Sequence, residues 1–402
     1  MPKIALINQP IGNRGDQAAH RALLRLLQEH SSLETTVLSL CAPQAIRQFA
    51  GAAPGVRYVT IPRFRKQKKL VRRAMYLPAF ARKFLTWTPE VREYNAVLRE
   101  SDYVLCAPGG ICMGAYRNWQ HVWELANALA LGKRSGIFGR SIGPFDGNRR
   151  ADVVFRRRSV EILRRVDFLS LRDSFSQQIA RELGVPFVPT LDTVYACQPE
   201  TELPEELRFL RNRQYVVLVP NQLSAWHPFF QDLPPERFEQ LYRSILREIL
   251  ALGLNVVMVP HLFDPQSDRP YFVRLAEGFE QTQVTVLPAT YDSDVQQQVV
   301  RASRLVIGAR AHAIVFAINN ARPFLCLSYE HKMLYMLKDL GLEEYALLLK
   351  DLVTQDTGVE QVKERMKTIL REEGRIAAKV EQARQTAADS VRRSFACFLA
   401  RL

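Results

Sequence analysis

Residues 308–332 read GARAHAIVFAINNARPFLCLSYEHK, and this stretch decides the fold. Its pattern predicts a short loop that opens a helix at residues 309–319, a break at residues 322–323, and a buried strand at residues 324–327. A helix that leads into a short, fully apolar strand is typical of a parallel sheet with helices on both faces.

The start of that helix carries charged and titratable side chains. Arg310 and His312 stand in its first turn, where free backbone N–H groups and the helix dipole favour an anion. A guanidinium binds carboxylate or phosphate through two hydrogen bonds, and an imidazole carries a proton near neutral pH. Lys332 follows the next strand, so we expect it at the same end of the sheet. The pattern favours a small anionic substrate that needs protonating; the alternative is a buried ion pair beside a core histidine.

The alternation of strands and helices extends over the whole chain. It pauses at residues 189–206, which contain three prolines, so we place a domain boundary between residues 198 and 199. The sequence therefore predicts an α/β protein with two doubly wound parallel-sheet domains, residues 1–198 and 199–402, facing a cleft. The expected strands are 3–8, 35–40, 56–61, 102–106, 135–138, 168–171, 215–219, 255–259, 285–287 and 305–307. A helical tail from residue 351 closes the chain.

Composition narrows the class of protein. With 402 residues, 47% hydrophobic and 24% charged, the chain is typical of a folded soluble protein. It enters its first strand directly and has no apolar run of the ~18–20 residues that span a bilayer, so we expect a cytoplasmic protein. The six cysteines are scattered without a C-x-x-C pair, which predicts neither a zinc site nor a disulfide framework. We expect no metal.

The net charge of +14 predicts attraction to something anionic. Basic residues gather in two blocks, at residues 63–73 and 149–158. Residues 69–87 place apolar side chains near one helical face with Lys and Arg around them, so the segment 63–87 has two interpretations. It rests on an anionic membrane, or it is a solvated helical insertion that Pro78 interrupts.

The loop after the first strand opens the first helix. Gly15 permits a tight turn, and we expect Asp16 to be the N-cap of the helix, with Asn13 beside it as a candidate substrate contact. The alternative is a capped helix with no ligand. The pattern is neither a dinucleotide fingerprint nor a phosphate-binding P-loop.

Two further loops of the first half carry glycines. Gly109 and Gly110 follow a buried strand and allow a ligand to approach the backbone closely. Arg140 and Ser141, within residues 139–145, suit an oxygen-rich ligand. The alternative for the second loop is a glycine turn that binds nothing.

Two more candidates stand at strand ends. Arg172 is a second anion clamp if it points into the cleft; alternatively Asp173 caps the next helix and Arg172 pairs with a nearby carboxylate. His261 follows the strand at residues 255–259 and is either a substrate contact or a solvent-exposed loop residue.

Seven short motifs occur together in a fixed order. They are N-x-G-D, P-G-G, G-x-S-I-G-P-F, S-x-R-D, V-P-H, R-x-H and Y-x-x-K, at residues 13–16, 108–110, 139–145, 170–174, 259–261, 310–312 and 329–332. Each is weak alone, but in this order they span nearly the whole chain. The chain thereby resembles the polysaccharide pyruvyl transferases.

The resemblance implies two Rossmann-like domains as in GT-B glycosyltransferases. It also implies transfer of the pyruvyl group of phosphoenolpyruvate onto two hydroxyls of a sugar, as a ketal. By the same resemblance, Arg310, His312, Lys332 and Arg172 belong to the donor site. His312 is our candidate general acid, because a group that titrates near neutrality is suited to protonating the methylene carbon. Asp16 is the candidate base.

Two positions depart from the family pattern. Ala311 replaces a bulkier aliphatic residue between Arg310 and His312, which enlarges the pocket. Residues 221–226 lack the acidic residues that some members carry there, which leaves the acceptor contacts unassigned. Phosphoenolpyruvate is expected as donor substrate with no cofactor, and the acceptor is a saccharide, lipid-linked or free.

Other functions remain in competition. A nucleotide-sugar glycosyltransferase of the same architecture would need a nucleobase site with an acidic residue on the ribose, for which we find no candidate. A basic nucleic-acid-binding protein would fit the charge, but the chain lacks the aromatic pattern of an RNA-recognition motif and a helix-turn-helix, so no nucleic acid is expected. A non-catalytic sugar-binding member of the family would not require Arg310 and His312.

Overall fold

The computed structural model describes residues 1–9, 13–30, 33–40, 46, 55–62, 69, 72–73, 75–76, 88–114, 117–262 and 266–402. The chain forms two compact units. The first comprises Met1–Ile11, Ala19–Ala196 and Ala388–Leu402, and the second comprises Gly12–Ala18 and Cys197–Ala387. The main change from one unit to the other thus falls two residues before the expected boundary, and two short segments cross that boundary.

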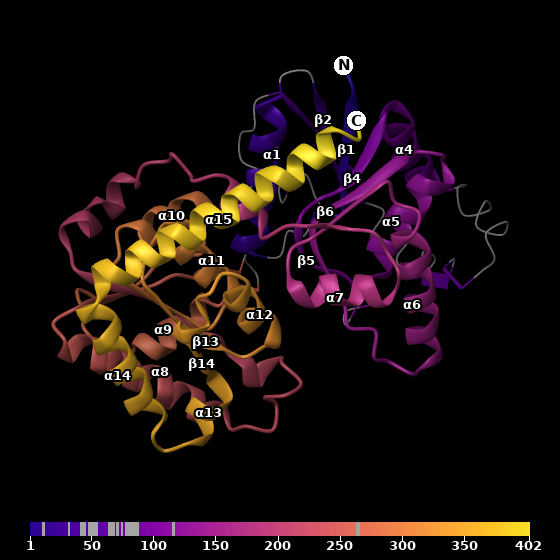
Figure 1. Cartoon of the computed structure of the whole chain (residues 1–402). Coiled ribbons are helices and arrows are strands. Elements are labelled where there is room, and N and C mark those ends of the chain that lie inside the picture. The colour runs from indigo at the N-terminus through magenta and orange to yellow at the C-terminus, as the bar shows by residue number, and fades with distance from the viewer. Residues whose placement is uncertain are drawn as a thin grey trace. The chain divides into compact units, whose positions relative to one another are not determined.

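The first unit contains an eight-stranded sheet in the order β3-β2-β1-β4-β6-β7-β8, with β5 paired to β6 (Figure 1). Every pair in its registers is parallel. The strands are β1 (Lys3–Ile7), β2 (Glu34–Ser39), β3 (Val56–Thr60), β4 (Tyr103–Cys106), β5 (Gly109–Gly114), β6 (Arg134–Gly143), β7 (Phe168–Leu171) and β8 (Val188–Pro189).

Helices cover both faces of this sheet. They are α1 (Arg14–Gln28), α4 (Pro89–Glu100), α5 (Trp119–Ala130), α6 (Arg150–Leu163) and α7 (Ser174–Glu182). The last residues of α15 (Glu373–Leu399) add a second layer, since Phe398 packs against Phe138 of β6 and Phe168 of β7 with ring centroids 6.3 and 5.5 Å apart.

Strand β6 corrects an expectation. Residues 139–143, expected as a loop, continue β6, and residues 109–114 form β5 beside them. Glycine explains why the strand bends without ending: Gly139 and Gly143 have φ of +57° and +71°, values that side chains disfavour. The register against β7 shifts between Ile137 and Arg140.

The second unit contains a six-stranded sheet in the order β11-β10-β9-β12-β13-β14. Its pairs are all parallel. The strands are β9 (Tyr215–Val219), β10 (Asn255–Met258), β11 (Val284–Val286), β12 (Leu305–Gly308), β13 (Phe324–Ser328) and β14 (Ala346–Leu348). The helices are α8 (Pro235–Ala251), α9 (Arg269–Ala276), α10 (Ser293–Arg301), α11 (Ala311–Asn319), α12 (His331–Asp339), α13 (Leu349–Thr354) and α14 (Gly358–Arg371).

Helix α8 shows why these segments fold as they do. Proline occupies its first position, where no backbone N–H is needed. Its buried side chains recur every three or four residues: Phe238, Leu241, Tyr242, Ile245, Leu246 and Ile249. Burying a side chain of that size contributes about 1.5–3 kcal/mol. The helix is therefore held by one apolar face.

The two units confirm the predicted α/β class with doubly wound parallel sheets, and α11 followed by β13 confirms the helix and strand expected from residues 308–332. None of the helices in the described part of the chain has the length and apolar composition that crossing a bilayer requires. Most of the basic segment 63–87 lies outside the described residues, so its expected membrane contact stays a prediction.

Candidate active site

Polar residues follow four neighbouring strands of the second sheet. Asn221 follows β9, His261 follows β10, Arg310 follows β12 and Glu330 follows β13. Because β10, β9, β12 and β13 are adjacent and parallel, their carboxyl ends meet at one edge of the sheet. Ligands of open α/β sheets bind beyond that edge.

Arg310 is the N-cap residue of α11 and forms an ion pair through Nε, 2.8 Å from Oδ2 of Asp268. The other oxygen of Asp268 accepts hydrogen bonds from the backbone N–H groups of His261 and Leu262, at 3.0 and 3.2 Å. The carboxylate is thereby fixed and orients the guanidinium. In the described part of the chain, the two terminal nitrogens of Arg310 have no hydrogen bond or ion pair. The buried ion pair that we gave as the alternative for Arg310 is therefore present, but it uses only one of the three guanidinium nitrogens.

The segment at the start of α1 belongs to the second unit. The Arg14 backbone N–H donates to the His261 carbonyl at 2.8 Å, and its guanidinium donates to the Ala289 carbonyl. The Gln17 side chain accepts from the Ser293 backbone N–H at 2.8 Å, at the start of α10. Hydrogen bonds therefore hold the N-terminal motif against the loop that follows β10.

Gly15 lies against the imidazole of His312. A Cβ atom on Gly15 would stand 1.9 Å from Cγ of His312 and 2.1 Å from its Nδ1, far inside contact distance. Only hydrogen at this position leaves room for the ring. The glycine of N-x-G-D therefore sets the place of the candidate general acid.

The N-cap of α1 is Asn13, and the expectation that Asp16 caps the helix is wrong. The helix begins at Arg14, and Oδ1 of Asn13 accepts from the backbone N–H of Asp16 at 2.8 Å. The Asp16 carboxylate accepts in turn from the Asn13 amide at 2.7 Å. This reciprocal pair is a variant of the capping box, which satisfies free donors of the first turn.

Lys332 lies at the start of α12 beside Glu330. Its Nζ is 2.6 Å from Oε2 of Glu330, whose other oxygen is 3.7 Å from Nε2 of His227. Burial lowers the pKa of His227, and Lys332 lowers it further, while Glu330 raises it. The Lys332 side chain is 34% exposed and remains accessible.

His261 contributes to the site through its backbone. Its side chain is 3% exposed and packs on Phe316, with ring centroids 5.5 Å apart. Burial holds the pKa of His261 well below its usual value, and the charges of Arg310, His312 and Arg14 act in the same direction. The imidazole is thus interior, so the exposed-loop role is wrong, while the expected substrate contact of His261 stays a prediction.

In the first unit, Arg140 is also an interior residue. Its guanidinium donates to the carbonyls of Ala107 at 2.5 Å and Gly110 at 3.5 Å, and to the carbonyl of Asn8. These contacts hold the loops that follow β1 and β4. Gly109, at φ +144°, begins β5 beside them.

Arg172 matches the alternative interpretation of its motif. Its Nη1 is 2.5 Å from Oδ2 of Asp192, with side chains 13% and 6% exposed. Its Nε donates to Ser141 Oγ at 3.1 Å, and Ser141 donates to Asp173 at 2.6 Å. Asp173 caps α7 by accepting from the Ser176 N–H at 2.7 Å.

Sequence reasoning missed four residues of the site. Glu330 stands inside Y-x-x-K and Arg14 inside N-x-G-D, so attention to the variable positions of those motifs would have found them. Asp268 and His227 lie in loops without any motif. No local signal marks them, because their partners are distant in sequence.

Solved structures define the class of the fold. Over the full length of both chains it resembles UDP-GlcNAc 2-epimerase from Neisseria meningitidis bound to UDP-GlcNAc, with a TM-score of 0.64 and 11% identity. It also resembles a UGT transferase from Siraitia grosvenorii in complex with UDP, with a TM-score of 0.56 and 12% identity over 100% of this chain and 99% of that one. The protein has a GT-B-like fold of two Rossmann-like units.

Sequence comparison then gives the family. The family model for polysaccharide pyruvyl transferase matches residues 13–331, from the first residue of the N-terminal motif. The chain therefore belongs to the polysaccharide pyruvyl transferase family and is a transferase. It is 24% identical over 373 residues to the amylovoran biosynthesis protein AmsJ of Erwinia amylovora, covering 86% of this chain and 87% of that protein.

Proposed function

We propose that the protein transfers the pyruvyl group of phosphoenolpyruvate onto two hydroxyls of a saccharide, which forms a cyclic ketal and releases phosphate. The observation that carries the proposal is Arg310: its orientation is fixed through Nε, while its terminal nitrogens have no partner in the described chain. Those two nitrogens match one carboxylate or one phosphate face.

In this proposal Lys332 binds the second anionic group of the donor. Arg310 and Lys332 follow the neighbouring strands β12 and β13. Phosphoenolpyruvate carries a carboxylate and a phosphate, so it offers one anionic group to each cation. Because Glu330 already contacts Lys332, the donor shares this lysine with a carboxylate, and Arg310 contributes most of the affinity.

The chemistry balances with His312 as acid. His312 gives its proton to the methylene carbon, which becomes a methyl group and leaves an oxocarbenium-like centre. One sugar oxygen bonds to the oxocarbenium carbon. The bond between this carbon and the phosphate oxygen then breaks, and the second sugar oxygen bonds to the same carbon and closes the ring. Of the two hydroxyl protons, one restores His312 and the other leaves with phosphate. Asp16, next in the chain to the Gly15 that contacts His312, stays the candidate base.

Donor binding is the first experiment. Thermal stability is measured with phosphoenolpyruvate for the native protein, for Arg310→Ala, and for Arg247→Ala as control, since Arg247 is exposed on α8. A ligand at ~100 times its dissociation constant stabilises the folded protein by about 2.7 kcal/mol. We expect the native protein and the control to shift, and Arg310→Ala not to shift.

The contrary results are equally clear. A shift that survives in Arg310→Ala places the donor elsewhere. A shift with a nucleotide sugar and none with phosphoenolpyruvate, alone or with saccharide, replaces the proposal by nucleotide-sugar transfer. Release of phosphate that depends on a saccharide, free or lipid-linked, then identifies the acceptor, and mass analysis of the product tests for the ketal.

A further inference from the structure

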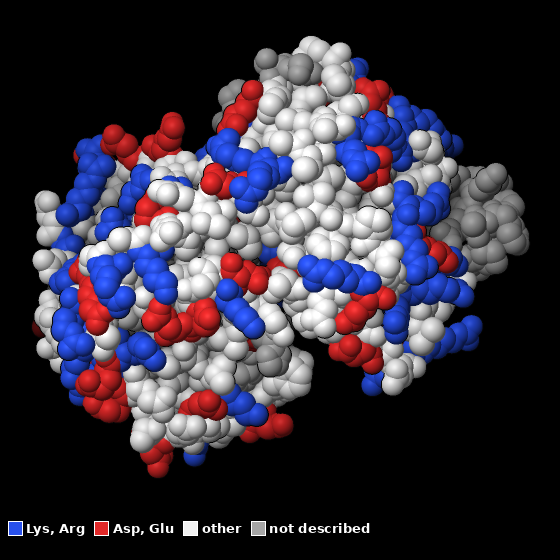
Figure 2. All heavy atoms as spheres, viewed as in Figure 1, with Lys and Arg blue, Asp and Glu red and all other residues white. Residues whose placement is uncertain are grey.

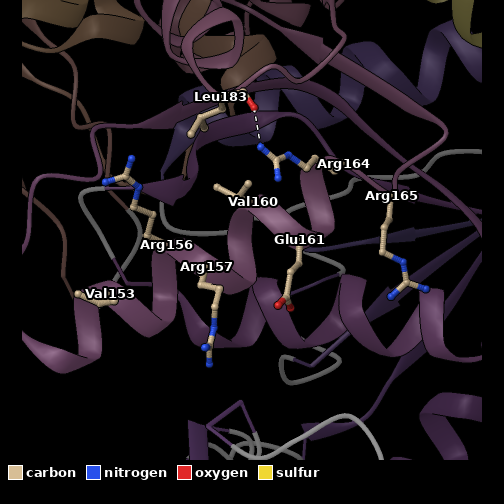
Figure 3. A pocket seen from close by; sticks show the side chains of 8 residues that line it. All are labelled: Val153, Arg156, Arg157, Val160, Glu161, Arg164, Arg165 and Leu183. Carbon is tan, nitrogen blue, oxygen red and sulfur yellow. Dashed lines mark hydrogen bonds between the residues drawn. The ribbon is translucent and has the colours of Figure 1, made fainter.

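Helix α6 carries a basic face that the donor site does not use. An open hollow of about 670 Å³ lies along it (Figure 3). The hollow is lined by Val153, Arg156, Arg157, Val160, Glu161, Arg164, Arg165 and Leu183. We call these side chains the α6 face. All of them belong to the first unit, so the face is complete within it.

The spacing of residues makes α6 two-sided. Positions 153, 156, 157, 160, 161 and 164 are three or four residues apart and therefore share one side of the helix. The opposite side is buried in the unit and includes Phe155, Ser159 and Ile162. Burial of that side fixes the helix, so the arginines are presented on a rigid support.

The positive charge of the α6 face is largely uncompensated. Its single acid, Glu161, already pairs with Arg158 at 2.8 Å. Arg164 donates to the Leu183 carbonyl at 3.0 Å, which leaves its charge in place. Among the described residues, Arg156, Arg157 and Arg165 form no ion pair. Figure 2 shows Lys and Arg atoms gathered over the region where α6 lies.

An apolar side chain stands among these charges. Val153 is 56% exposed, and Val160 lines the same hollow. A soluble polyanion would pair with the arginines but would leave Val153 in water. The boundary of a bilayer satisfies both, because arginines contact lipid phosphates while the apolar side chain enters the acyl region.

A second basic stretch lies beside the face. The buried Arg158 donates from Nε to the Met75 carbonyl at 3.1 Å, which joins α6 to a residue two positions after the first basic block. Arg72 and Arg73, three and two residues before Met75, are exposed. The described residues Arg72 and Arg73 therefore lie close in sequence to a residue that is bonded to α6.

We propose that the α6 face docks the protein on an anionic phospholipid surface. The proposal does not depend on the identity of the donor, so it stands or falls separately from pyruvyl transfer. It gives the protein a place beside membrane-borne substrates through a surface contact.

The test measures binding of the full-length protein to sedimented vesicles. One set contains phosphatidylcholine alone, and the other contains phosphatidylcholine with phosphatidylglycerol. We expect binding to the second set only, weakened by added salt. An arginine near an anionic surface contributes about fivefold in affinity, so Arg156→Gln with Arg157→Gln should reduce binding roughly thirtyfold.

Matched variants separate this face from bulk charge. Arg247→Gln with Arg365→Gln removes the same charge from exposed positions of the second unit and should bind nearly as the native protein does. Val153→Ser should weaken binding, while Val273→Ser, at a valine 40% exposed on α9, should not. Thermal midpoints confirm that each variant is folded.

Three results would overturn the proposal. In the first, the native protein binds both kinds of vesicle equally well or binds neither kind. In the second, the control double variant loses as much binding as the double variant of the α6 face. In the third, a soluble anionic polysaccharide binds with the same arginine dependence and competes fully with vesicles, and that polymer then replaces the membrane as occupant. Pyruvyl transfer to a soluble acceptor, measured alongside, stays unchanged in all cases.

Discussion

Arg172 in the first unit and Arg310 in the second stand at equivalent places, each between a parallel strand and the helix after it. Each pairs with a buried aspartate, Asp192 or Asp268. Arg172 uses both Nε and Nη1 within the unit, whereas Arg310 uses Nε alone. The position of an arginine at a strand end therefore does not decide its role. What decides it is the part of the guanidinium that internal partners leave unused.

The same difference extends to the neighbouring residues. In the first unit, Arg140 donates hydrogen bonds to loop carbonyls, and Ser141 donates one to Asp173. In the second, Lys332 keeps a third of its side chain exposed. The polar side chains of the first unit's motif are bonded within the fold, whereas part of the second unit's motif remains accessible, as the proposed donor site requires.

The largest effect is expected at Arg310. Arg310→Ala removes two charge-assisted hydrogen bonds to the donor, worth about 1.5–3 kcal/mol each, so kcat/KM for phosphoenolpyruvate should fall roughly hundredfold or more. The measurement is steady-state phosphate release. A value near that of the native protein would mean that the free nitrogens of Arg310 have no role and would erase the contrast between the two arginines.

Arg172→Ala should act on stability instead. Removing the cationic partner of this buried ion pair costs about 3–5 kcal/mol. Urea unfolding should show this loss while donor affinity stays unchanged. The double variant Arg172→Met with Asp192→Asn should recover part of it. Loss of donor affinity with intact stability would make Arg172 an anion clamp after all.

Glu124 is another polar side chain that is bonded inside the first unit, and the pH dependence of stability tests its burial. Burial raises the pKa of Glu124 to about 7, although Gln120 and Tyr94 donate to it. Between its unfolded pKa near 4.3 and this value, the folded state holds a proton that the unfolded state has lost, so stability falls as pH rises through that window. The fall should be about 3–4 kcal/mol and should disappear in Glu124→Gln. An unchanged pH profile in the variant would assign the slope to other groups.

Gly15 should give the smallest effect. Gly15→Ala pushes a methyl group into His312, which costs about 1–3 kcal/mol and should lower kcat roughly tenfold through misplacement of the imidazole. Gly374→Ala is the control, because a Cβ atom there would meet nothing within 4 Å. If both variants behave alike, the contact between Gly15 and His312 does not position the acid.

Much of this architecture could be predicted from the sequence. Fully apolar strands such as β9 and β12 have a clear local pattern, and so does the amphipathic α8. Strands β5 and β8 were missed for physical reasons: β5 contains three glycines among its six residues, and β8 has two residues with a proline. Their strand structure comes from their neighbours rather than from their own propensity.

The site divides in the same way. The sequence places Arg310 and His312 at a helix start, as the structure has them, because a helix start is a local feature; their roles stay predictions. The partners of the site residues were not identified, since Arg14 contacts a carbonyl 275 residues away and Asp268 lies 42 residues before Arg310. Distinguishing a ligand-binding arginine from a structural one requires those partners. One sequence alone does not supply them.

The assignment of Gly12–Ala18 to the second unit and of Ala388–Leu402 to the first has a consequence for synthesis on the ribosome. Gln17 is bonded to Ser293, which is synthesised 276 residues later. At about 5–20 residues per second, this delay is roughly 15–55 s. The first sheet, in turn, lacks Phe395 and Phe398 until the chain is almost finished. We therefore expect neither unit to reach its final packing on the ribosome, and the nascent chain to carry an unfinished apolar surface until release.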